Sequence, residues 1–150
     1  HTRVPGDPAQ LADTAHRLAQ AFAEAVEKTC EGQLPEPTLE IACWVEQRAL
    51  GNELLRELDQ LQPFGQANPE PILGLRDVHL AQAPRAVGQN HFRFKVSNGD
   101  ELVSGIAWNL ADRKPPADQP LDLAIRLGWN EWNGVTSSQM TLLDWRLAEN

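Results

Sequence analysis

Residues 61–71, Leu-Gln-Pro-Phe-Gly-Gln-Ala-Asn-Pro-Glu-Pro, restrict the fold of this chain more than any other stretch of the sequence. They hold three prolines and one glycine, which exclude the interior of a helix and the centre of a sheet. Apolar residues recur at helical spacing before this stretch and alternate after it. The sequence therefore predicts a helical segment over residues 1–62, a rigid proline-rich joint over 63–71 with Phe64 as its anchor, and a β domain over 72–150.

The chain has 150 residues, enough for one domain, or for one domain and a sizeable appendage. Its apolar content of 41% is ordinary for a protein that folds around a core. It shows neither the run of roughly 18 apolar residues that a membrane span needs nor the pattern of a signal peptide, so no membrane partner is expected. Cys30 and Cys43 have no metal-binding spacing, which predicts free thiols in a reducing cytoplasm.

The charge of the chain is unevenly distributed along its length. The net charge of −8 argues against a general binder of polyanions. Residues 1–71 hold 5 basic and 12 acidic groups, whereas residues 72–150 hold 8 basic and 9 acidic groups. The acidity therefore belongs to the helical segment, and a local basic face on the β domain remains compatible with the composition.

The first segment predicts two helices and one strand. Asp7 and Pro8 are typical of a helix start, and Gly32 is placed to end that helix. Residues 39–46 alternate as a strand does, and this strand needs a partner either in the β domain or in a part of the protein outside this chain. Asn52 is expected to cap a second helix, whose buried side carries Leu54, Leu55, Leu58 and Leu61.

The β domain shows five strand-like runs, at residues 72–80, 90–97, 102–108, 121–129 and 139–147. The dipeptides Asn98-Gly99 and Asn133-Gly134 are turn signals between runs. Residues 109–120 form an insertion between the third and fourth runs. Five short strands with such an insertion fit a five-stranded OB-type β-barrel, and the competing fold is a fragment of a five-stranded sandwich. The whole chain is then α+β, with N-terminal helices and one strand before the barrel.

Several motifs follow one another in an order that resembles a known family. They are Pro-Phe-Gly-x-x-Asn-Pro-Glu-Pro at residues 63–71, Val-Gly-Gln-Asn-His-Phe-Arg-Phe at 87–94, Gly-Ile-Ala-Trp-Asn at 105–109 and Asn-Glu-Trp-Asn-Gly at 130–134. Over residues 38–150 the chain is similar to the C-terminal part of bacterial RecJ-type exonucleases, which are specific for single-stranded DNA. The resemblance implies the end of the second catalytic-core domain, a connecting helix and an OB domain that binds single-stranded DNA.

The resemblance also implies what this chain lacks. The Asp-His-His motif and the aspartate metal ligands of the family's nuclease core have no counterpart here, so no catalytic residue is predicted. His1, His16, His79 and His91 are scattered and do not suggest a metal site. By resemblance, the longer protein is a 5′-to-3′ exonuclease of DNA repair and recombination that depends on Mn²⁺ or Mg²⁺, whereas this part needs no cofactor.

The second run of the β domain carries the main candidate site. Alternation separates its apolar side chains, which are expected in the core, from His91, Arg93 and Lys95, which are expected outside. By resemblance, this outward face meets single-stranded DNA, with Arg85 from the preceding loop as a further phosphate contact. Binding of a single strand also needs aromatic side chains on which bases stack. Trp132 is the tryptophan predicted to be exposed, where it contacts a base or a partner protein, or covers the end of the barrel.

The other tryptophans of the β domain are predicted to be structural. Trp129 continues an apolar alternation, Trp145 shares a face with leucines, and Trp108 matches an apolar family position. Arg126 points outward and contacts either a phosphate or a residue across the strand.

Two further roles remain open for the domain. It is either a docking site for the single-stranded-DNA-binding protein or a brace for the nuclease core. Docking of the acidic tail of that protein would require a basic pocket with an apolar floor.

Overall fold

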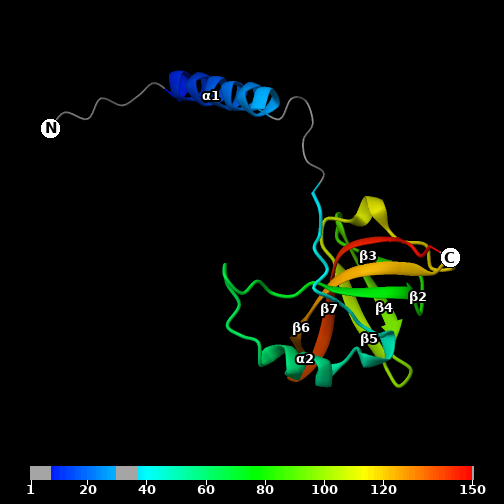
Figure 1. Ribbon diagram of the computed structural model, residues 1–150. Coiled ribbons are helices and arrows are strands. Elements are labelled where there is room, and N and C mark those ends of the chain that lie inside the picture. The colour runs from blue at the N-terminus through cyan, green and yellow to red at the C-terminus, as the bar shows by residue number, and fades with distance from the viewer. Residues whose placement is uncertain (1–7, 30–36, 150) are drawn as a thin grey trace. The chain divides into compact units, whose positions relative to one another are not determined.

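The computed structural model describes residues 8–29 and 37–149 (Figure 1). They fall into two units, His1–Thr38 and Leu39–Asn150. The first unit holds helix α1, Pro8–Thr29, in the place that the sequence predicts. Leu18 and Phe22 on this helix are exposed. Asp7 and Gly32, the residues expected at its two ends, lie outside the described residues.

The second unit contains all of the strands found in the described residues. In chain order its elements are β1 Cys43–Trp44, the 3₁₀ turn η1 Gln47–Ala49, α2 Asn52–Asp59, β2 Leu73–Val78, β3 Arg85–Val87, β4 His91–Ser97, β5 Leu102–Ala107, η2 Ala111–Arg113, β6 Leu121–Trp132 and β7 Val135–Leu147.

These strands form one mixed sheet in the order β1-β2-β6-β7-β5-β4-β3. β1 pairs with β2 and β5 with β7 in parallel, and the other neighbours are antiparallel. The α+β class is confirmed. The closed five-stranded barrel is wrong, because seven strands form an open sheet, and the sandwich alternative fails because there is one sheet. An isolated bridge between Leu80 and Val96 joins the segment just after β2 to β4.

The predicted alternation places the core correctly along β4 and most of β6. Phe92, Phe94 and Val96 are buried, as are Leu121, Leu123, Ile125 and Leu127 of β6. Other strands and the segment before them complete one cluster, with members that include Leu50, Leu55, Leu73, Leu75, Val103, Met140 and Leu142. Trp129, predicted to continue this set, is instead 41% exposed.

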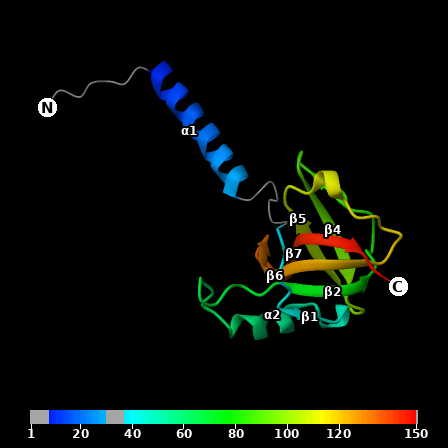
Figure 2. The same ribbon diagram turned by 45° about the horizontal axis from the view of Figure 1, so that its top comes forward.

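The segment before the joint packs into the same unit as the sheet. β1 is much shorter than the predicted strand, and its partner is β2, which decides between the two partners left open by the sequence. Leu50 and Leu55 lie in the core of the sheet. The compact unit therefore begins at Leu39, whereas the sequence placed the start of the β domain at residue 72. Figure 2 shows β1 beside β2, whereas α2 contacts β6 and β7.

Helix α2 begins one residue earlier than predicted and buries less. Gly51 occupies its N-cap, with φ of 150°, and Asn52 is the first helical residue. Leu55 is buried, Leu54 and Leu58 are partly buried, and Leu61 is exposed rather than packed.

The joint is an ordered loop held by its own hydrogen bonds. Asn68 Nδ2 donates to the carbonyl oxygens of Leu61 at 2.7 Å and Pro63 at 3.1 Å. The backbones of Gly65 and Asn68 also hydrogen-bond each other in both directions. Phe64 in this loop is half-buried.

The side chain of Asn52 attaches α2 to the sheet. Its Oδ1 accepts the backbone N–H of Ser138 on β7 at 2.8 Å, and Ser138 is buried. In Asn52→Ala this N–H loses its partner, so we expect a loss of about 1–3 kcal/mol in the free energy of unfolding, measured with urea. Asn52→Asp keeps an acceptor and should lose much less. Equal losses in the two variants would contradict this role.

Candidate nucleic-acid interface

A groove of about 680 Å³ lies over the outward face of the sheet. One wall carries Arg85 from β3 with Arg93 and Lys95 from β4. Ser104 and Ile106 from β5 form its floor, and the β6–β7 hairpin contributes Asn130, Trp132, Ser137 and Gln139. The groove therefore brings together four of the five predicted site residues, namely Arg85, Arg93, Lys95 and Trp132.

The cationic wall contains an unfavourable pair. Arg85 and Arg93 are direct partners across the antiparallel β3–β4 ladder, and Lys95 lies two residues farther along the face of Arg93. Within residues 8–29 and 37–149, no ion pair includes any of the three. Like charges directly opposite each other destabilise a sheet, and a bound anion removes that repulsion. The geometry is thus suited to a phosphate or a carboxylate.

The floor of the groove is apolar at its centre. Ile106 is the β5 partner of Arg93 and is only 6% exposed, although it lies outside the main core cluster. Ser104, the partner of Lys95, supplies a hydroxyl beside it. No lining residue, all of them in the described part of the chain, carries a carboxylate. Cations and neutral hydrogen-bonding groups therefore surround a small apolar floor.

Trp132 is exposed as predicted, at the end of β6. It pairs with Val135 on β7, and Asn133 and Gly134 between them both have positive φ, 51° and 75°. Two consecutive residues with positive φ are typical of two-residue hairpin turns. Asparagine and glycine adopt this conformation readily, which explains why they form the turn between β6 and β7. The Trp132 side chain is 71% exposed and faces the groove.

Trp108 also lines the groove, and the sequence did not predict this. It was expected to pack like the apolar residue at the matching family position, but it is 51% exposed. β5 ends at Ala107, so Trp108 is one residue beyond the ladder, and no second layer covers it. The sequence signal that could have indicated an exposed Trp108 is its position directly after the end of a predicted strand.

His91 lies next to the groove rather than in it. Its Nδ1 accepts the backbone N–H of Asn109 at 3.0 Å, so the proton of the neutral ring is on Nε2. Its ring meets Trp108 edge to face, with 4.8 Å between the ring centroids and an interplanar angle of 73°. The side chain predicted as a DNA contact is therefore placed as a support for Trp108.

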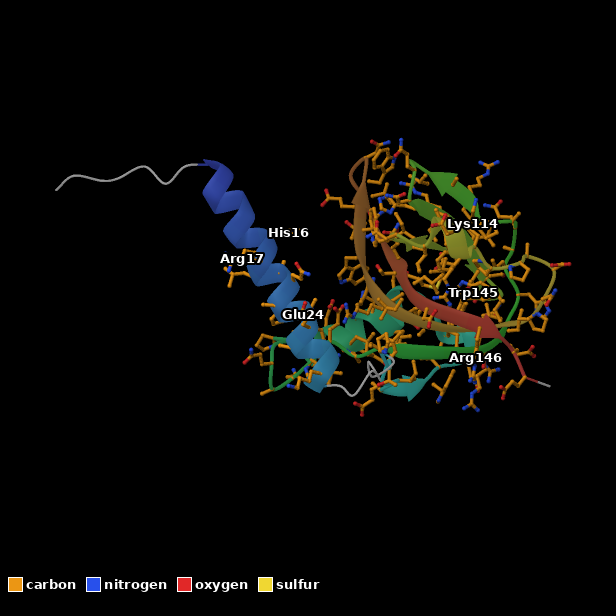
Figure 3. The ribbon with its side chains drawn as sticks, turned by 90° about the horizontal axis from the view of Figure 1, so that it is seen from above. His16, Arg17, Glu24, Lys114, Trp145 and Arg146 are labelled. Atoms are coloured by element: carbon orange, nitrogen blue, oxygen red, sulfur yellow. The ribbon has the colours of Figure 1, made fainter. Side chains whose placement is uncertain are left out.

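The remaining tryptophans of the β domain have structural partners. Trp145 is partly buried against the core, as predicted, and its Nε1 donates to the carbonyl oxygen of Arg113 at 2.6 Å. Figure 3 shows Trp145 beside Arg146 on β7. Arg146 Nε and a terminal guanidinium nitrogen donate to Asp122 at 3.0 and 2.9 Å.

A second hollow, of about 460 Å³, lies between α2, the joint and β6. Trp129 lines it and donates from Nε1 to Asp59 Oδ2 at 2.7 Å. Glu70, on the same lining, pairs with Arg126 at 3.5 Å, so Arg126 contacts the joint rather than a neighbouring strand. Its two carboxylates make this hollow unsuitable for a polyanion, in contrast to the groove over β3–β5.

The described residues meet the requirements of neither a metal site nor a membrane-spanning helix. Among them, no three His, Cys, Asp or Glu side chains come together in a way that could hold a metal ion. No helix in the same residues is long and apolar enough to cross a membrane.

Both a family model and individual proteins resemble this chain. A family model described as the RecJ OB domain matches residues 41–144. The single-stranded-DNA-specific exonuclease RecJ of Thermus thermophilus is 29% identical over 88% of this chain and 19% of its own length. RecJ of Dickeya dadantii is 34% identical over 75% of this chain and 18% of its own length.

Solved structures agree with the sequence comparisons. The crystal structure of RecJ from Thermus thermophilus in complex with Mn²⁺ superposes with a TM-score of 0.63 at 28% identity, and the match covers 90% of this chain and 20% of that one. The structure of the same enzyme with Mg²⁺ gives a TM-score of 0.62. The chain thus spans about a fifth of the length of the relatives that it matches.

Proposed function

Since this chain belongs to the RecJ OB domain family, we propose that it is a noncatalytic module that binds single-stranded DNA for a RecJ-like exonuclease. The observation that supports this most is the cationic wall of the groove, where Arg85 and Arg93 face each other without a carboxylate partner among the described residues. A backbone phosphate between the two guanidinium groups would bring one negative charge to both and relieve the repulsion between them.

The remainder of the groove suits a single strand better than a duplex. Trp108 and Trp132 offer exposed rings, and unpaired bases stack on such rings at about 1–3 kcal/mol per base. Bases within a duplex are already stacked and paired, so they cannot use these rings without being opened. Three cations are enough for a weak interaction, which matches a module that would hold a strand for a separate nuclease core.

The longer protein to which this module would belong, and its activity, are proposed from the family and not from the residues of this chain. The proposal includes a longer cytoplasmic protein that digests single strands from 5′ to 3′ with Mn²⁺ or Mg²⁺ in DNA repair and recombination. It also includes the first unit, residues 1–38, as the end of that protein's second core domain, because residues 41–62 fall within the OB-domain match and pack into the same unit as the sheet.

Titration of this chain with a fluorescent single-stranded oligonucleotide tests the proposal. With three phosphate contacts, the affinity should fall about 20-fold between about 50 and 200 mM salt, because each contact releases counterions from the strand. Arg93→Ala combined with Lys95→Ala should remove most of this salt dependence. Absence of binding at low salt, or binding that the double variant leaves unchanged, would refute the proposal.

A second candidate function has one observation in its favour. The buried side chain of Ile106 between the cations gives the groove an apolar floor, which fits an acidic peptide with an apolar end, such as a tail of the single-stranded-DNA-binding protein. In the same titration, an acidic peptide of this kind would compete with the oligonucleotide if it occupies the groove. A scrambled peptide of equal charge is the control.

A further inference from the structure

The two tryptophans of the groove lie at different levels of the sheet. Ala107, next to Trp108, pairs with Leu142 of β7, whereas Trp132 pairs with Val135 of the same strand. Seven residues of β7 separate these levels, which corresponds to about 23 Å along the strand. Stacked nucleotides of one strand repeat at about 3.4 Å, so the two rings cannot contact the same base.

The cations lie between these two levels. Arg93 pairs with Ile106, which in turn pairs with Thr141, and Lys95 pairs with Ser104, which pairs with Gln139. Thr141 and Gln139 both fall between Leu142 and Val135 on β7. A DNA strand that lies along the groove therefore contacts one tryptophan ring, then the cations, and then the other tryptophan ring.

The walls differ in the part of a nucleotide that they suit. Arg85, Arg93 and Lys95 lie on β3 and β4, whereas Asn130, Gln139 and Trp132 on the hairpin carry amides and an indole. Cations bind phosphates, and amides and indoles bind base edges and base faces. The division holds along the groove, since no hairpin residue in its lining is charged.

The ring of Trp108 is held in place before any ligand binds. The Nδ1 of His91 is fixed by the N–H of Asn109, and the His91 ring then packs edge to face with Trp108. A side chain that is 51% exposed would otherwise lose rotamer freedom on binding, which weakens affinity. His91 is thus a positioning residue for Trp108.

Resting on the proposed function, we propose that the single strand runs with its phosphates along β3–β4 and its bases turned toward the hairpin. Trp108 and Trp132 stack on two different bases at opposite ends of the groove, several nucleotides apart. The contact with Trp108 depends on His91.

An abasic scan tests this arrangement. An oligonucleotide of about eight nucleotides is just long enough, at about 3.4 Å per nucleotide, to reach both rings, so only one register engages both. It is made with one stable abasic nucleotide at each position in turn and a fluorophore at one end for detection, and Kd is measured for each. The wild-type chain should lose about 5- to 140-fold in affinity at two separated positions, because one stacked base is lost at each. Trp108→Ala should abolish the sensitivity at one position and Trp132→Ala at the other.

Matched variants separate stacking from folding. Trp129→Ala removes a similarly exposed tryptophan outside the groove and should leave both sensitivities unchanged. His91→Ala should reduce sensitivity only at the position that depends on Trp108, and His91→Asn, which keeps an acceptor for Asn109 but no ring, should not restore it. Thermal melts verify that each variant is folded.

The outcomes distinguish this inference from the function that it rests on. If the chain binds no oligonucleotide, both fail. If it binds but all abasic positions are equivalent, or only one position is sensitive, the proposed function stands and the arrangement is refuted.

Discussion

Substitution of Gly105 with alanine should be the most damaging single methyl addition in the sheet. A Cβ at this position would lie 2.6 Å from Cε2 of Phe94 and closer still to two other atoms of that ring. Gly105 and Phe94 are partners across β4 and β5, and Phe94 is buried, so its ring has no free space to enter. We expect a loss of about 3 kcal/mol or more in the free energy of unfolding, since the ring must leave its site.

Two other glycines calibrate this prediction in the same urea or thermal measurement. A Cβ at Gly128 on β6 would meet nothing within 4 Å, so Gly128→Ala should be close to neutral. A Cβ at Gly74 would meet the ring of Trp44 at 2.5 Å, but Trp44 is an exposed side chain that can move, so the loss should be intermediate. Equal losses for Gly105 and Gly128 would show that the Phe94 ring is not the cause.

The sequence predicted the five longer strands, β2 and β4 to β7, whereas it missed β3 and made β1 too long. β4 buries every second side chain along its whole length and β5, β6 and β7 do so over part of theirs, whereas β2 does not alternate. β3 has three residues, which is too short for any periodicity, and β1 has only two although residues 39–46 alternate in sequence. Their existence depends on pairing with β2 and β4, which the local sequence does not specify.

Alternation also predicted too much burial at Trp129. The ladder between β2 and β6 reaches only from Leu121 to Ile125, and β6 continues for seven more residues beyond it. Past Leu127 only the end of α2 and the joint lie near that face, around an open hollow, so Trp129 is 41% exposed although it stays in phase with the core. Periodicity gives the face of a residue, but the extent of the covering layer is a tertiary property.

The candidate site could be predicted only in part for the same reason. The outward direction of Arg93 and Lys95 follows from the burial of the residues between them. That Arg85 lies opposite Arg93 is a matter of register between two strands, and that His91 supports Trp108 depends on two strand ends. Neither can be deduced from spacing along the chain.

Arg93→Glu should weaken DNA binding while leaving the fold intact or slightly more stable. In the free protein the substitution replaces the repulsion between Arg85 and Arg93 with an opposite-charge pair, worth about 0.2–1 kcal/mol in favour of the folded state. In the complex with DNA, Arg93→Glu removes one phosphate contact and places a negative charge near the phosphates. The new carboxylate also pairs with Arg85, which is then less available to the DNA. We expect affinity to fall more than about tenfold, and the salt dependence to approach that of one contact.

Two charge-matched variants decide whether the register between β3 and β4 is the cause. Lys95→Glu makes the same change of charge opposite Ser104, so it should weaken binding without any gain in stability. Arg56→Glu, on α2 and outside the groove, should affect binding little. If Arg93→Glu loses stability, Arg93 holds the sheet together and the repulsion argument is wrong. If it gains stability and binding is unchanged, the two arginines face each other but no phosphate lies between them. Only the combination of a stable fold and lost affinity fits a groove in which the unpaired arginines are retained for an anionic ligand.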